Sequence, residues 1–167
     1  MRVLGIDCGT ECTGYGVVEL CANDKLICVD CGAIRLSLRD SPPARLAAIF
    51  DKLSAVIAEC RPDHVAIEDV FYALNVKSAL KLGQVRGVAM LTAAAAGLTV
   101  AEYAPLSIKS AVVGYGRAEK HQVQHMVTHL LNLPAIPEPA DITDALAIAI
   151  CHLHTWATLE RQRATAP

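Results

Sequence analysis

Three runs of strand-forming residues follow one another at the start of the chain, and only short connections separate them. They cover residues 2–8, 13–20 and 25–36. Two parallel neighbouring strands need a crossover of a dozen or more residues, usually a helix, whereas antiparallel strands need only a turn. The sequence therefore predicts that the fold begins with a three-stranded antiparallel meander.

Helices and strands alternate after this meander. Pro42 and Pro43 mark the start of a helix whose apolar residues recur at helical spacing as far as Cys60. The pattern then predicts a strand over 64–70, a helix over 76–96, a strand over 98–103, a short helix from 105, a helix over 118–131 and a last helix from 141. This order predicts an α/β fold with a five-stranded mixed sheet flanked by helices, and it resembles the ribonuclease H-like fold. In that fold the first strand is central, the fourth lies beside it and the last helix crosses their ends.

Length and composition indicate one domain with a core of its own. We expect it to cover residues 1–160, followed by a disordered polar tail over 161–167. The apolar run over 88–101 is interrupted and shorter than the roughly 20 residues of a membrane-spanning helix, so no membrane association is expected. Seven cysteines, an odd number without a secretory signal, favour free thiols in a cytoplasmic protein.

Four acidic residues stand at the ends of apolar segments, where an ionised side chain is costly unless a cation or hydrogen-bond donors compensate it. Asp7 ends the first predicted strand, Glu68 lies at the end of the fourth, and Asp141 and Asp144 open the last helix. If these segments converge, the carboxylates form a site for a divalent cation that prefers oxygen ligands. Taken alone, Asp141 and Asp144 also suit helix capping, because acidic side chains in a first turn satisfy free N–H groups.

Basic residues are concentrated in one part of the chain. Residues 77–125 contain six Lys and Arg residues against two acidic ones, although the net charge of the whole chain is −2. A basic surface beside an acidic centre is expected of a protein that holds a polyanion and cuts it with metal ions. Solvated helix faces would give the same count, so charge alone leaves both interpretations open.

Five blocks of sequence, in order along the chain, carry a closer resemblance. They are residues 5–9 (GIDCG) with 13–16 (TGYG), 66–71 (AIEDVF), 78–87 (SALKLGQVRG), 112–120 (VVGYGRAEK) and 141–147 (DITDALA). Together they resemble the RuvC family of Holliday junction resolvases over residues 2–154. That family usually has Pro at the position of Cys8 and often Gln at the position of Asp69.

This resemblance implies an endonuclease that resolves four-way DNA junctions in recombination and repair. It implies symmetric, metal-dependent hydrolysis in two opposed strands, which leaves 5′-phosphate and 3′-hydroxyl ends. Asp7, Glu68, Asp141 and Asp144 correspond to the catalytic acids, which would hold one or two Mg²⁺ ions per subunit, with Mn²⁺ as a substitute. Lys109 and Lys120 correspond to catalytic lysines near the scissile phosphate. The expected DNA-binding residues are Phe71, which corresponds to a base-contacting aromatic, with Lys77, Lys81, Arg86, Lys109, Arg117 and Lys120.

A stripe of small residues marks the predicted helix over 76–96. Gly83 and Gly87 each cost about 1 kcal/mol relative to Ala inside a helix, so a close packing partner is implied. Ala79 and Leu91 extend the stripe. The resemblance implies a homodimer through this helix, because two symmetric cuts need two active sites; packing on the protein's own sheet is the alternative. It also implies a branch-migration complex of the RuvA and RuvB type as a partner.

Other interpretations of the same residues lead to other functions. Asp7, Gly9 and Thr10 with Gly14 also resemble the phosphate-binding hairpin of actin-like and sugar-kinase ATPases, which close two lobes around a nucleotide. This chain has length for one lobe. An interaction module that uses the fold only as a scaffold would leave the four acids unexplained.

Two clusters of metal-ligand residue types have simpler explanations. His121, His125 and His129 share a helix face. A solvated or DNA-facing stripe is favoured over a zinc site, because the helix turns and usually only two such side chains converge on one point. Cys28 and Cys31 form a C-x-x-C without the second pair that completes a structural zinc site.

Overall fold

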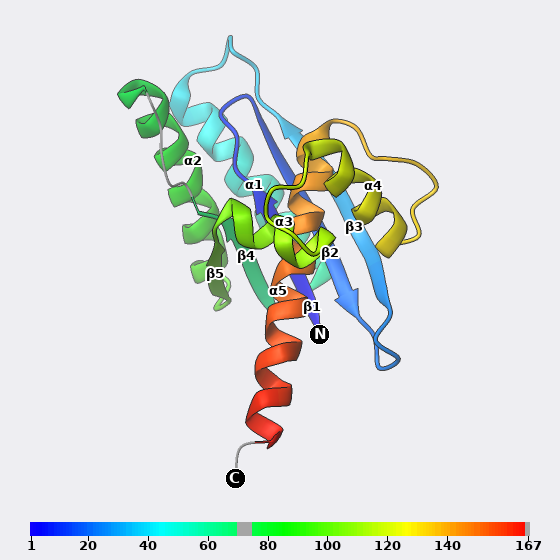
Figure 1. Ribbon diagram of the computed structural model, residues 1–167. Coiled ribbons are helices and arrows are strands. Elements are labelled where there is room, and N and C mark those ends of the chain that lie inside the picture. The colour runs from blue at the N-terminus through cyan, green and yellow to red at the C-terminus, as the bar shows by residue number, and fades with distance from the viewer. Residues whose placement is uncertain (70–74, 166–167) are drawn as a thin grey trace.

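The computed structural model describes residues 1–69 and 75–165. A five-stranded sheet lies between two groups of helices (Figure 1). The strands are β1 (Arg2–Asp7), β2 (Cys12–Leu20), β3 (Leu26–Arg35), β4 (His64–Glu68) and β5 (Thr99–Tyr103). The helices are α1 (Pro42–Cys60), α2 (Val76–Ala95), α3 (Pro105–Val113), α4 (Lys120–Leu130) and α5 (Ala140–Thr165).

The sheet has the order β3-β2-β1-β4-β5. The first three strands pair antiparallel, whereas β4 is parallel to β1 and β5 is parallel to β4. The short hairpins allow the antiparallel pairs, and α1 and α2 supply the crossovers that the parallel pairs need. The predicted meander, the central first strand and the five-stranded mixed sheet of the ribonuclease H-like fold are therefore confirmed. The described residues form one sheet, not the two lobes of the ATPase alternative.

Helices cover both faces of the sheet, so β1 and β4 are buried on both sides. Along β1, alternate side chains enter different cores. Val3 joins the core beneath α3, α4 and α5, whereas Leu4 and Ile6 join the core beneath α1 and α2. This double cover explains why the segments that lead to Asp7 and Glu68 read as continuous apolar runs.

Helix α5 rests directly on the backbone of β1 and β2. A Cβ atom on Gly5 would stand 2.1 Å from the carbonyl oxygen of Ala145, and one on Gly14 would stand 1.9 Å from that of Asp141. Both separations are shorter than real Cβ atoms tolerate. Glycine at these two positions therefore lets the first turns of α5 lie beside the end of β1.

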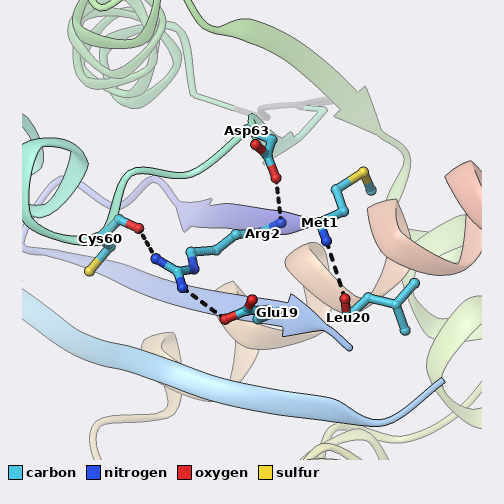
Figure 2. Close-up of polar contacts among 6 residues, drawn as sticks. All are labelled: Met1, Arg2, Glu19, Leu20, Cys60 and Asp63. Atoms are coloured by element: carbon cyan, nitrogen blue, oxygen red, sulfur yellow. Dashed lines mark hydrogen bonds and ion pairs between the residues drawn. The ribbon is translucent and has the colours of Figure 1, made fainter. Parts of the chain in front are cut away.

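Arg2 anchors the other end of β1 (Figure 2). Its backbone N–H donates to the Asp63 carboxylate at 2.7 Å, and its guanidinium donates to Glu19 at 2.8 Å. The guanidinium also donates to the carbonyl oxygen of Cys60 at the end of α1. These partners belong to α1, to β2 and to the loop before β4, so the strand that carries Asp7 is tied to all three.

The C-terminal helix is longer than the sequence indicated. It continues to Thr165, past the expected domain boundary at residue 160, so residues 161–165 are helical where a disordered tail was expected. Arg, Gln and Ala make up four of these five residues, and all three favour helix. Residues 166–167 lie outside the described residues. Among the helices that the structure describes, none is long and apolar enough to cross a membrane.

Candidate active site

Three of the four acidic residues line one cavity of about 220 Å³. Ile6 of β1 is paired with Ile67 of β4, so the next residues, Asp7 and Glu68, end their strands side by side. Asp144 comes from α5, which crosses this edge of the sheet. The remaining lining residues are Lys109, Lys120, Pro105, Ile108, Val123, Ala147 and Ile148.

Asp141 lies beside the cavity and does not line it. Its carbonyl group rests over Gly14, and its charge adds to burial in raising the pKa of the Cys12 thiol. The negative charge of Asp141 still acts on Asp7. Asp141 lies inside the first turn of α5, after Ala140, and therefore does not occupy the N-cap position of that helix.

Asp7 is the most perturbed acid of the group. Burial first, and then the charges of Asp144, Glu68 and Asp141, together raise its pKa to about 7 against the opposing charge of Lys120. A carboxylate in this position is costly to ionise because both desolvation and like charges oppose it. The electrostatics therefore favour a cation next to Asp7.

Glu68 shows the same effect more weakly. Burial and the charge of Asp144 raise its pKa, whereas Lys109, Lys120 and Arg86 lower it. Lys109 belongs to α3, Lys120 opens α4 and Arg86 belongs to α2. Three cations from three helices thus surround a carboxylate at the end of β4.

Lys120 forms an ion pair with Asp144 across the cavity. The ammonium Nζ lies 2.7 Å from Oδ2 of Asp144, and this hydrogen bond raises the pKa of Lys120. The lysine side chain is 60% exposed, and exposed ion pairs are worth about 0–1 kcal/mol. Lys120 is therefore free to exchange its carboxylate partner for a phosphate oxygen.

The donor set suits a hard divalent cation. The acids offer carboxylate oxygens, which Mg²⁺ prefers, and a cation would relieve their mutual repulsion. In residues 1–69 and 75–165, no three His, Cys, Asp or Glu side chains already enclose a position for an ion. A bound cation would therefore draw the carboxylates together and compete with Lys120 for Asp144.

The residues expected to bind DNA are distributed over several surfaces, and their roles remain predictions. Phe71 lies outside the described residues. Lys77 and Lys81 line a second cavity of about 380 Å³ between α1 and α2, together with Arg45. Arg117 is exposed just before α4.

Arg86 points inward. Its side chain is 13% exposed, and its guanidinium donates to the backbone carbonyl of Glu68 and to the carboxylate of Glu102. The partner Glu102 was not anticipated from the sequence. A signal was present, because Arg86 stands at helical spacing with Leu82, Ala89 and Ala93 on the stripe that faces the core.

The small-residue stripe of α2 faces away from the protein's own sheet. A Cβ atom on Gly83 or Gly87 would meet no atom within 4 Å, and Leu80 and Leu91 are 65% and 61% exposed. The core-facing residues of α2 are Val85, Ala89, Thr92 and Ala93. Packing of the stripe on the sheet, the alternative to a dimer contact, is therefore wrong.

The other metal-ligand residue types do not gather into a site in the described part of the chain. His121, His125 and His129 are all exposed on α4. Cys28 and Cys31 are free thiols on β3.

Comparisons with known proteins agree on one family. The family model described as crossover junction endodeoxyribonuclease RuvC matches residues 3–152. A relative of the same description from Koribacter versatilis is 65% identical over 166 residues, 99% of this chain and 100% of the relative. A solved structure of T. thermophilus RuvC in complex with Holliday junction substrate has a TM-score of 0.87 and 30% identity, and covers 95% of this chain and 96% of that one. The yeast mitochondrial Holliday junction resolvase Ydc2 shares the fold at 15% identity, with a TM-score of 0.70 over 97% of this chain and 83% of that one.

Proposed function

The chain belongs to the RuvC family of crossover junction endodeoxyribonucleases, and we propose that its acidic cavity cuts four-way (Holliday) DNA junctions in recombination and repair. One observation supports this assignment at the level of single residues. Asp7, Glu68 and Asp144 line the same cavity as Lys109 and Lys120. Carboxylates that suit a divalent cation and lysines that suit a phosphate are the groups that phosphodiester hydrolysis needs. The products would carry 5′-phosphate and 3′-hydroxyl ends.

The four acids would hold Mg²⁺ in different ways. Asp7, Glu68 and Asp144 would supply ligands from the cavity wall, and Asp141 would supply charge or a ligand from beside it. One or two bound Mg²⁺ ions, or Mn²⁺ in their place, would activate a water and stabilise the leaving oxygen. The raised pKa of Asp7 supports this role, because a cation makes the ionised form favourable.

The two lysines act on the DNA backbone. Lys120 exchanges Asp144 for the phosphate, and Lys109 neutralises charge from the opposite helix. Phe71, Lys77, Lys81 and Arg117 extend the predicted DNA surface, with Phe71 next to the end of β4 in sequence.

The enzyme acts as a homodimer through α2. The exposed stripe of Ala79, Gly83 and Gly87 with Leu80 and Leu91 supports this contact, because small residues allow two helices to approach closely. A twofold axis gives two cavities, one for each of two opposed strands. In the cytoplasm, a branch-migration complex of the RuvA and RuvB type would deliver the junction.

A cleavage assay tests the proposed function. A synthetic four-way junction and a linear duplex of the same sequence are incubated with Mg²⁺ or EDTA, using wild type and Glu68→Gln. We expect paired nicks on opposed strands of the junction in Mg²⁺ with wild type, and none in the other combinations. Intact junction with wild type in Mg²⁺ would overturn the proposal.

A further inference from the structure

Arg86 connects helix α2 to the backbone at the end of β4. Its Nη1 donates to the carbonyl oxygen of Glu68, and its Nη2 pairs with the carboxylate of Glu102 on β5. Asp69 Oδ1 lies 4.0 Å from the same Nη2. One planar guanidinium thus contacts the ends of two neighbouring parallel strands.

The carbonyl group that Arg86 holds lies where the sheet ends. The register of β1 with β4 stops at Ile6 and Ile67, one residue before Glu68. On the other side, the Asp69 N–H still donates to the Tyr103 carbonyl at 2.8 Å. The backbone of Glu68 is therefore supported by β5 on one side and by a side chain from α2.

We infer that Arg86 is a positioning residue that fixes the direction of the Glu68 carboxylate in the acidic cavity, with Glu102 as its counter-charge. Holding the carbonyl group limits rotation of the peptide that follows Glu68, and so fixes the Cα position from which its carboxylate points. The inference rests on the proposed function, since it gives Arg86 a part in that same site. The fork geometry matters, because a lysine ammonium is a point charge that lacks a fixed pair of donors.

Burial and charge argue against direct contact between Arg86 and DNA. Its side chain is 13% exposed, compared with 60% for Lys120, which lines the cavity. Glu102 neutralises its charge. A phosphate would have to displace two carboxylates to reach it, whereas Lys120 gives up one exposed ion pair.

The position of Arg86 also connects two parts of the proposed enzyme. Its neighbour Gly87 belongs to the exposed stripe of α2, and its guanidinium donates a hydrogen bond to Glu68, whose carboxylate lies in the cavity. A displacement of α2 would therefore be transmitted to Glu68 through one side chain.

The test compares Arg86→Gln, Arg86→Lys and Glu102→Gln with wild type and a control, Lys25→Gln. Lys25 is exposed in the turn between β2 and β3, at the opposite end of β2 from Gly14. Three quantities are measured: Mn²⁺ affinity of the DNA-free protein by titration calorimetry, junction affinity in EDTA, and single-turnover cleavage in saturating Mg²⁺. Thermal unfolding shows that each variant is folded.

For Arg86→Gln we expect Mn²⁺ affinity and the cleavage rate to fall about 10- to 100-fold, which is typical when a residue that orients a metal ligand is lost. Junction affinity in EDTA should stay within about twofold of wild type, because only a lost phosphate contact weakens metal-free binding. Arg86→Lys should recover part of the loss, Glu102→Gln should weaken Mn²⁺ binding in a folded protein, and Lys25→Gln should match wild type.

If Arg86→Gln folds, either of two outcomes would overturn the inference. One is a folded Arg86→Gln with wild-type Mn²⁺ affinity and wild-type cleavage. The other is weaker junction binding in EDTA at unchanged Mn²⁺ affinity, which would make Arg86 a DNA contact. If Arg86→Gln does not fold, unchanged Mn²⁺ affinity in both Arg86→Lys and Glu102→Gln would overturn it equally. Absence of cleavage by wild type would instead remove the proposed function, while the Mn²⁺ comparison would still test Arg86.

Discussion

Replacing Asp7 with Asn should stabilise the metal-free protein while it abolishes cleavage. Burial and three neighbouring acids raise the pKa of Asp7 from 3.8 to about 7. Because the folded protein binds this proton more tightly than the unfolded chain, Asp7 contributes most to stability below pH 3.8. That contribution is lost as the pH rises through about 7.

The size of the effect follows from the pKa difference. A rise from 3.8 to about 7 corresponds to about 4 kcal/mol of destabilisation once Asp7 is ionised in the folded protein. Asn removes the charge with little change of shape, but its amide must find partners in the same place, which costs about 1–2 kcal/mol. A net stabilisation of about 2–3 kcal/mol is therefore expected above pH 8.

Urea unfolding in EDTA measures this difference, with both proteins at equal concentration so that self-association affects them alike. Near pH 4 Asp7 is protonated in the folded protein, so only the cost of the Asn amide remains and the wild type should be the more stable by about 1–2 kcal/mol; above pH 8 the Asn variant should be the more stable protein. Saturating Mg²⁺ should then stabilise the wild type, by about 2.7 kcal/mol at a hundredfold excess over Kd, and the variant much less. The reasoning is refuted if Asp7→Asn is no more stable than wild type above pH 8 in EDTA.

Three further perturbations test other parts of the structure. Lys120→Ala removes the ammonium 2.7 Å from Asp144 and should slow single-turnover cleavage about 100-fold with little loss of junction affinity; an unchanged rate would exclude Lys120 from the mechanism. Gly14→Ala places a Cβ 1.9 Å from the Asp141 carbonyl oxygen, so thermal unfolding should show a loss of about 3 kcal/mol, and wild-type stability would contradict the close seating of α5. Burial and the charge of His64 lower the pKa of His152 from 6.5 to about 4, so about 3 kcal/mol of stability should be lost as the pH falls through that range. His152→Phe should show a shallower acid profile in urea titrations, and identical profiles would refute this assignment.

Most of the fold was predictable from local pattern. Apolar runs that end in Asp7 and Glu68 identify strands buried on both faces, and hairpins too short for a crossover require the antiparallel meander. The close approach of α5 could be anticipated only from the resemblance. A glycine in a strand indicates that another group packs closely against the backbone, but it does not identify that group.

The details that escaped prediction depend on three-dimensional contacts. The rotation of α5 about its axis places Asp144 in the cavity and Asp141 over Gly14, although the two acids look equivalent in the sequence. Arg86 looked like one of several surface cations until its partners on β4 and β5 were located. The sequence shows that Arg86 is charged but not which way its side chain points. The side chain points inward because the carbonyl and carboxylate groups at the ends of β4 and β5 accept its hydrogen bonds.

The register of the outer strand is a further case. A bulge shifts the pairing of β3 between Val17 and Val18 of β2. Because side chains alternate along a strand, the extra residue brings Cys28 and Cys31, three residues apart, to the same core. Periodicity alone would have placed their thiols on opposite faces.

The acids of the cavity come from distant parts of the chain, and this spacing has a consequence for synthesis. Asp7 and Glu68 emerge from the ribosome with the first strands, but Asp141 and Asp144 follow only with α5. A nascent or truncated chain that ends before residue 140 holds half of the acids. If the four acids act together as proposed, the capacity to cut DNA arises only when the last helix docks on Gly5 and Gly14.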